Sequence, residues 1–216
     1  MNQRKKRFAL AVLLAFVCLQ VSACGRVASL SGGSSSLGPP PVGVLSLSFI
    51  DVGQGDSILV QAGSESYLID AGNSEEGSKV VDFLRSRGVD QLDGMISTSG
   101  DADHSGGLAD VLDAFTVENI YVSGYPKETL TYTNFLRTAR EEVNTEGASF
   151  SALSAGNALD WAGRRVDVLN PPACSGEEYS GSNDSSVAVL LTYGRARVIL
   201  AGDAEEDAEE YISQSP

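Results

Sequence analysis

The chain has 216 residues, enough for one domain with a hydrophobic core of its own. It contains 29 acidic and 15 basic residues, so its formal net charge is −14. Because phosphate groups are bound by basic side chains, this acidity argues against tight nucleic-acid binding by the chain alone. Cys18, Cys24 and Cys174 have neither the number nor the spacing of a disulfide framework or a paired-cysteine metal site, which excludes both.

The first 23 residues have the order of a bacterial secretion signal. Residues 4–7 are basic, residues 8–19 are apolar, and small residues follow. The apolar run is shorter than a transmembrane helix requires. The sequence Val-Ser-Ala-Cys at 21–24 resembles a lipobox, which implies that residues 1–23 are removed and that Cys24 carries a lipid. In the alternative interpretation Cys24 is incidental and the signal is cleaved without lipidation.

Removal of residues 1–23 takes four basic residues away and leaves 11 basic and 29 acidic residues, a formal net charge of −18. Residues 24–43 are rich in Gly, Ser and Pro and cannot bury enough apolar surface to form a core, so they are predicted to be a flexible tether. The folded domain is expected at 44–216. These features predict an exported protein held at the outer face of the cytoplasmic membrane through the lipid on Cys24.

The body of the chain alternates between strand-like and helix-like patterns. At 45–49, apolar residues alternate with serines, which predicts a strand with one buried face. Next come strands at 57–61 and 66–70, a helix at 76–87, a strand at 92–97, a short helix at 106–115, a strand at 117–122 and a helix at 130–143. Strands at 149–153, 165–169, 186–193 and 197–201 and a helix at 204–212 complete the pattern. This order predicts an α/β domain whose helices cover the faces of its sheets.

Clusters of polar residues follow three of these strands, at positions where α/β sheets commonly bind ligands. The first cluster, at 51–57, contains Asp51 and Asp56 among glycines, and it also fits a simple hairpin turn. The last cluster ends in Asp203, directly after an apolar strand. Its carboxylate could bridge two metal ions or cap the final helix.

The cluster at 97–107 places Asp101, Asp103 and the only histidine, His104, in one strand-to-helix turn. Carboxylate and imidazole donors this close together suit a divalent transition metal. Either aspartate could instead satisfy the first amides of the helix at 106–115. From these residues alone the two interpretations are equally good.

Five motifs, in this order and at about this spacing, resemble the metallo-β-lactamase superfamily, and within it the exported hydrolase domain of ComEC-type DNA-uptake proteins. They are FIDVGQGDS at 49–57, LIDAG at 68–72, TSGDADHSGG at 98–107, NDSSVAVLL at 183–191 and LAGD at 200–203. One such motif alone is weak support, whereas five in the family's order identify the fold. The resemblance implies an αββα sandwich that spans most of the chain after residue 44.

The resemblance also implies roles for the polar clusters. Asp101 falls at the second ligand position of the family's signature turn, and Asp103 and His104 fall at the third and fourth. Asp203 takes the place of the carboxylate that bridges two metal ions. Asp103 would also orient the attacking water, which makes it the candidate catalytic residue. Supporting positions around the ligands fall to Asp51, Asp56, Asp70 and Ser99.

The chain departs from the family's pattern at two points. Ser99 stands where the signature turn has its first histidine, and a neutral hydroxyl is a poor substitute for imidazole. The sequence also stops at Pro216, before the family's late histidine, so the second half of the sandwich is expected to be incomplete, with an open sheet edge beside residues 198–200. The donors that remain are rich in oxygen, which suits manganese or magnesium better than a tight zinc pair. The resemblance implies one or two divalent ions, zinc or manganese.

Two functions fit this pattern. The first is an exported metal-dependent hydrolase of phosphodiester bonds, related to DNA-uptake proteins and with nucleic acid among its candidate substrates. The second is a catalytically degenerate lipoprotein that keeps the fold for binding or as a scaffold. Ser99, the missing late histidine and the acidic surface favour the second.

Overall fold

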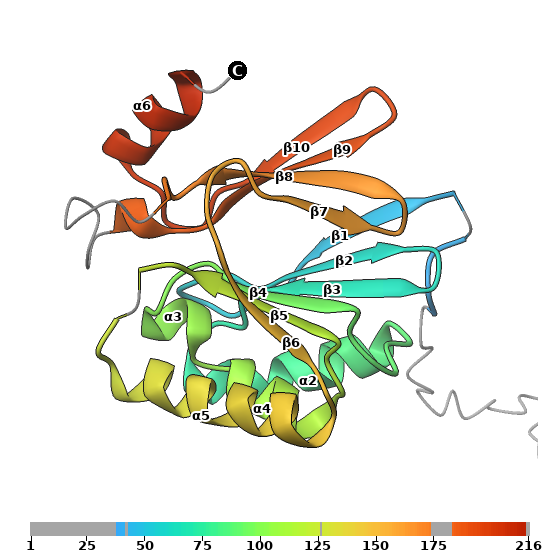
Figure 1. Ribbon diagram of the computed structural model, residues 1–216. Coiled ribbons are helices and arrows are strands. Elements are labelled where there is room, and N and C mark those ends of the chain that lie inside the picture. The colour runs from blue at the N-terminus through green and yellow to red at the C-terminus, as the bar shows by residue number, and fades with distance from the viewer. Residues whose placement is uncertain (1–37, 42, 126, 174–182, 215–216) are drawn as a thin grey trace, which may run out of the picture. The chain divides into compact units, whose positions relative to one another are not determined.

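The computed structural model describes residues 38–41, 43–125, 127–173 and 183–214 (Figure 1). All of them belong to one structural unit, which begins at Ser36. The predicted signal peptide, Cys24 and the tether up to residue 37 lie outside the described residues, so they stay predictions. In the described part of the chain, no helix has the length and apolar character needed to span a bilayer.

Six strands form the first sheet, in the order in which they occur along the chain. They are β1 (Leu45–Phe49), β2 (Ile58–Ala62), β3 (Glu65–Ile69), β4 (Gly94–Ser97), β5 (Asn119–Ser123) and β6 (Ser149–Leu153). Strands β1 to β3 pair antiparallel, whereas β3 to β6 pair parallel. Because parallel pairs need crossover connections, helices follow β3, β4 and β5.

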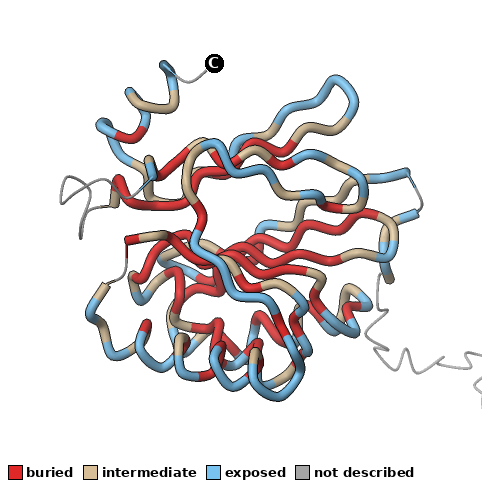
Figure 2. Tube along the Cα trace, viewed as in Figure 1, coloured by how far each residue is buried: buried red, intermediate tan, exposed pale blue. Residues whose placement is uncertain are grey.

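Three helices cover one face of this sheet: α2 (Gly77–Ser86), α4 (Leu108–Ala114) and α5 (Leu130–Thr145) (Figure 1). The alternation of side chains along β2 and β3 divides the core in two. Leu59 and Leu68 face the helices, whereas Val60 and Ile69 belong to a second core on the other face. Figure 2 accordingly shows the central strands as almost continuous buried stretches. This double burial explains why these strands read as continuous apolar runs.

The second sheet packs on the free face of the first and has four antiparallel strands in the order β10-β9-β8-β7. They are β7 (Ala158–Trp161), β8 (Arg164–Asn170), β9 (Ala188–Tyr193) and β10 (Ala196–Leu200). Trp161 stacks on Tyr67 of the first sheet with 4.4 Å between ring centroids. In the described part of the chain, β10 forms the outer edge of its sheet, as expected for residues 198–200.

A short helix closes the described part. It is α6 (Glu206–Gln214), which follows β10 and packs against β8 and the 3-10 turn η4 (Asn183–Ser185). Asp184 of η4 accepts hydrogen bonds from the backbone amides of Glu205 and Ala208, at 3.1 and 3.0 Å, and so caps the start of α6. The arrangement of two sheets with helices confirms the predicted α/β class.

Three local features differ from the sequence prediction. Strand β7 was not predicted. A hairpin turn at Ala162 and Gly163 joins it to β8, and both residues have positive φ, 53° and 74°. Glycine or asparagine is usual at the first position of such a turn, where this chain has alanine. Helix α3 (Ala102–Ser105) is too short to show helical periodicity. Phe49, predicted to be buried, is 68% exposed because it ends the edge strand β1.

Candidate metal centre

Four loops meet where β1, β3, β4 and β10 end. Backbone hydrogen bonds tie three of them together: the amide of Asp56 donates to the carbonyl of Asp103 (3.2 Å), the amide of Gly72 to that of Asp56 (2.9 Å), and the amide of Ala71 to that of His104 (2.9 Å). The loop after β10 brings Asp203 to the same place. Residues far apart in the chain are therefore held close together by main-chain contacts.

Close approach in these loops requires glycine. A Cβ atom on Gly55 would lie 1.9 Å from the carbonyl oxygen of Asp103, and φ at Gly55 is 111°. A Cβ atom on Gly202 would lie 2.8 Å from Oγ1 of Thr98, with φ at 55°. Both glycines let a neighbouring loop touch the turn that contains the ligands.

Asp70 forms the floor of the site. It is fully buried and adopts φ of 56°, which residues other than glycine rarely do. Its Oδ1 accepts a hydrogen bond from the amide of Thr98 at 2.8 Å, and its Oδ2 accepts one from the hydroxyl of Thr98 at 2.5 Å. The same Oδ2 lies 2.8 Å from Nδ1 of His104. A strained backbone held by this many contacts is typical of a functional site.

This contact fixes the orientation of the imidazole. With Nδ1 donating to Asp70, the other ring nitrogen, Nε2, is left to act as a ligand, an arrangement common behind metal-binding histidines. Burial lowers the pKa of His104, but the hydrogen bond and charge of Asp70, together with Asp203, outweigh burial and raise this pKa to about 10. The surroundings of the ring therefore strongly favour positive charge.

Asp103, His104 and Asp203 form a group whose ligand atoms all lie within 4.8 Å of one another. Nε2 of His104 is 3.2 Å from Oδ2 of Asp203, near enough for an ion pair, yet this buried nitrogen makes no hydrogen bond among the described residues. A buried nitrogen without a hydrogen bond, next to two carboxylates, fits a divalent cation held by all three residues. These three residues therefore provide a suitable set of ligands for one metal ion.

Asp56, a predicted supporting residue, lies close to His104. Its carboxylate forms a second group with Asp70 and His104, again with ligand atoms within 4.8 Å. Burial raises the pKa of Asp56, the charges of Asp70, Asp203 and Asp103 raise it further, and His104 opposes them. A cation bound beside this carboxylate would oppose the rise in its pKa.

Asp101 belongs to neither group. Its Oδ2 pairs with Nζ of Lys127 and also accepts a hydrogen bond from the hydroxyl of Ser99 at 3.2 Å. Asp51 is likewise in neither group: its side chain is 91% exposed, it accepts a hydrogen bond from the amide of Gly53, and its nearest cation is Lys79 at 4.0 Å. The metal-ligand role of Asp101 and the supporting role of Asp51 stay predictions.

Three residues around the site were not anticipated from the sequence. Gln54 donates a hydrogen bond to Oδ2 of Asp103 at 3.3 Å, and the hydroxyl of Thr98 donates one to Oδ2 of Asp70. The ammonium group of Lys127 forms an ion pair with Asp101. Gln54 and Thr98 lie inside motifs, so their positions in FIDVGQGDS and TSGDADHSGG were a usable signal. Lys127 has no local signal, because it reaches the site from the segment between β5 and α5.

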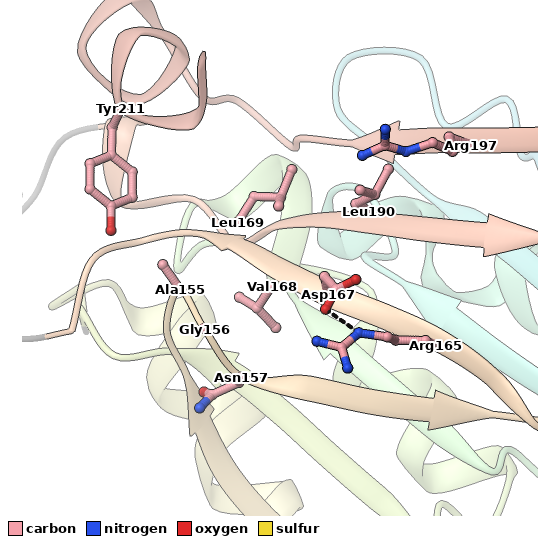
Figure 3. A pocket seen from close by; sticks show the side chains of 10 residues that line it. All are labelled: Ala155, Gly156, Asn157, Arg165, Asp167, Val168, Leu169, Leu190, Arg197 and Tyr211. Atoms are coloured by element: carbon pink, nitrogen blue, oxygen red, sulfur yellow. Dashed lines mark hydrogen bonds and ion pairs between the residues drawn. The ribbon is translucent and has the colours of Figure 1, made fainter. Parts of the chain in front are cut away.

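A hollow on the second sheet offers a different environment (Figure 3). Its walls include Leu169 and Leu190 from the sheet and Tyr211 from α6. The one carboxylate among the described residues that line it, Asp167, accepts a hydrogen bond from Arg165 at 2.6 Å. With its acid already paired, this hollow does not form a metal-binding group.

Comparison with known proteins agrees with this geometry. A sequence model of the metallo-β-lactamase superfamily matches residues 50–214. ComE operon protein 3 of Bacillus subtilis (strain 168) is 31% identical over 182 residues, which cover 76% of this chain and 22% of that protein. Recombination protein 2 of Haemophilus influenzae is 26% identical over 171 residues, which cover 77% and 19%. The chain thus matches about a fifth of the length of these curated relatives.

Solved structures are similar at the level of the fold. The metallo-β-lactamase GOB-18 from Elizabethkingia meningoseptica superposes with a TM-score of 0.52 at 14% identity, covering 78% of this chain and 63% of that one. The MIM-2 metallo-β-lactamase gives a TM-score of 0.51 at 15% identity, covering 73% and 58%. At these identities the likeness concerns the path of the chain and not the substrate.

Proposed function

This chain belongs to the metallo-β-lactamase superfamily, as its motifs predicted, and on that premise we propose that it is an exported metal-dependent hydrolase of phosphodiester bonds. The observation that carries the proposal is the buried Nε2 of His104, which lies 3.2 Å from Oδ2 of Asp203 and close to Asp103 but makes no well-oriented hydrogen bond among the described residues. Asp103, His104 and Asp203 would hold the ion. The chemistry that a divalent ion supplies at such a site is Lewis-acid activation of water and of the scissile bond.

The chain's own residues prepare the site for this reaction. Asp70 and Thr98 hold the imidazole so that Nε2 faces the ligand group. Gln54 donates to one oxygen of Asp103 and so fixes the plane of the carboxylate that would orient the attacking water. Burial and the neighbouring acids raise the pKa of Asp56, which makes this residue a candidate to carry a proton during the reaction. The main-chain hydrogen bonds between the loops hold Asp56, Asp103 and His104 in the positions that these roles require.

The substrate class rests on weaker support. Recombination protein 2, by its name, acts in recombination, and the chain is similar to it over 171 residues. The net charge of −14 opposes tight binding of a polyanion. We therefore propose brief encounters with a phosphodiester substrate, on the outer face of the membrane to which a lipid on Cys24 would hold the protein.

A second candidate function is a scaffold or binding protein that has lost catalysis. Two observations favour it: Ser99 in place of a histidine, and the pairing of Asp101 with Lys127. Both reduce the number of side chains that can hold metal. Metal binding and phosphodiester cleavage are the measurements that separate the two functions.

We expect Mn²⁺ to raise the melting temperature of the purified chain with increasing concentration, because a cation at about 100 times its Kd stabilises the folded state by about 2.7 kcal/mol. Asp203→Asn should remove most of this gain, since it takes a charge from the ligand group. Asp113→Asn, which removes an exposed carboxylate from α4, is the matched control and should keep it. The readout is differential scanning fluorimetry against Mn²⁺ and Zn²⁺ concentration.

Hydrolysis of bis(para-nitrophenyl) phosphate by the same variants tests the reaction itself. Activity in the unaltered chain and in Asp113→Asn, lost in Asp203→Asn, is the expected result. Metal-dependent stabilisation without any hydrolysis would favour the scaffold. A melting temperature that ignores both metals would rule out the metal centre.

A further inference from the structure

Lys127 is placed unusually for a lysine. Its side chain is only 11% exposed, and its ammonium group pairs with Oδ2 of Asp101, whose side chain is 29% exposed. The residue comes from the segment between β5 and α5, and the pair joins positions 26 apart in the chain. A lysine is rarely buried to this extent unless a partner compensates for the lost hydration.

The segment around Lys127 is built onto the ligand turn. Thr129 caps α5, where its Oγ1 accepts a hydrogen bond from the amide of Tyr132, and it donates to the carbonyl of Gly100 at 3.1 Å. Gly100 has no Cβ atom, and one placed there would lie 2.9 Å from Cβ of Lys127 and 3.1 Å from the ring of Tyr132. The stem of Lys127 therefore fits against the turn in a space that only glycine leaves.

Asp101 differs from the other acids of the turn in having its charge compensated. One oxygen, Oδ2, faces both the ammonium of Lys127 and the hydroxyl of Ser99, while the Oγ of Ser99 accepts a hydrogen bond from the amide of Asp101 at 3.1 Å. In contrast, no lysine or arginine of the described residues forms an ion pair with Asp103 or Asp203. Of these three acids, Asp101 is therefore the one that a lysine compensates among the described residues.

We propose that the ammonium group of Lys127 takes the position of a second cation in this turn, so that the chain holds a single divalent ion, on Asp103, His104 and Asp203. This inference rests on the proposed function and adds that the centre has one metal ion. The positive charge of Lys127 repels a divalent ion from Asp101, and Ser99 offers no imidazole to compete. Removal of the ammonium and restoration of an imidazole should together open the second position.

The test is the number of ions bound per chain, measured by elemental analysis after equilibrium dialysis against Mn²⁺ and by titration calorimetry. We expect one ion for the unaltered chain and one for Ser99→His, because the ammonium still occupies the second position. The double variant Ser99→His with Lys127→Met should bind two ions. Lys127→Met alone should bind one ion tightly, since the methionine stem keeps the packing on Gly100.

Control variants keep the outcome interpretable. Lys79→Met removes a half-exposed lysine on α2 and should leave every count unchanged. Ser99→His with Lys127→Gln repeats the double variant with a different neutral side chain, in case methionine disturbs folding. Two ions in the unaltered chain or in Ser99→His, or one ion in both double variants, would overturn this inference and leave the proposed function standing. No bound ion in the unaltered chain would overturn the proposed function itself.

Discussion

The carboxylate of Asp70 has no exposure to solvent, and Thr98 and His104 direct donors toward it. It accepts hydrogen bonds from the amide and hydroxyl of Thr98, and it lies 2.8 Å from Nδ1 of His104. The last contact determines which nitrogen of His104 can face Asp203. A residue that never touches the ion would therefore control how well the ion is bound, through the tautomer of its neighbour.

Asp70→Asn tests this role at the scale of one residue. The amide group would place a donor toward the hydroxyl of Thr98 and Nδ1 of His104, which shifts the imidazole proton to Nε2 and weakens the ligand. We expect the affinity for Mn²⁺ to fall by about 10- to 100-fold. Asp93→Asn is the matched control, because Asp93 is partly buried and, like Asp70, accepts a hydrogen bond from a backbone amide, that of Ser66 at 2.7 Å, away from the site. Calorimetry that finds equal affinity for Asp70→Asn and the unaltered chain would refute the role.

At the scale of elements, most strands and helices were predictable because local sequence determines them. The turn with Asp103 and His104 was recognised because its residues are adjacent, and Asp203 because it comes directly after an apolar strand. Lys127 was not recognised, since its place depends on how the segment before α5 packs on Gly100. Strand β7 was missed because four residues give too little alternation and Ala162 is an uncommon turn residue.

The contribution of Asp184 to the start of helix α6 can be tested by mutation. The motif NDSSVAVLL contains Asp184, and its carboxylate caps α6 through the amides of Glu205 and Ala208. Asp184→Ala should lower the free energy of unfolding by about 1 to 2 kcal/mol, as loss of a helix cap does. Asp184→Asn keeps an acceptor and should cost only a few tenths of a kcal/mol. Urea denaturation provides the measurement, and an unchanged free energy of unfolding in Asp184→Ala would show that the cap contributes nothing.

For the whole molecule, the net negative charge determines how the protein can bind a membrane surface. Without residues 1–23 the chain carries 11 basic and 29 acidic residues, a formal net charge of −18. A domain this acidic is repelled by anionic lipid head groups and gains no electrostatic attraction to the surface. Attachment at the outer face of the membrane, as proposed, would then depend on a covalent lipid and not on the folded domain.

The lipid on Cys24 is the feature that this proposal requires. Cells fed an alkyne fatty acid should label the unaltered protein, and Cys24→Ala should abolish the label and move the protein from the membrane fraction to the soluble one. Cys18→Ala and Cys174→Ala are controls that remove the other two cysteines and should keep the label. Since the acidic domain is repelled by anionic head groups, we expect loss of label and loss of attachment to coincide. Label that persists in Cys24→Ala would exclude Cys24 as the anchor, and membrane attachment that persists without label would mean that the folded domain itself binds the surface.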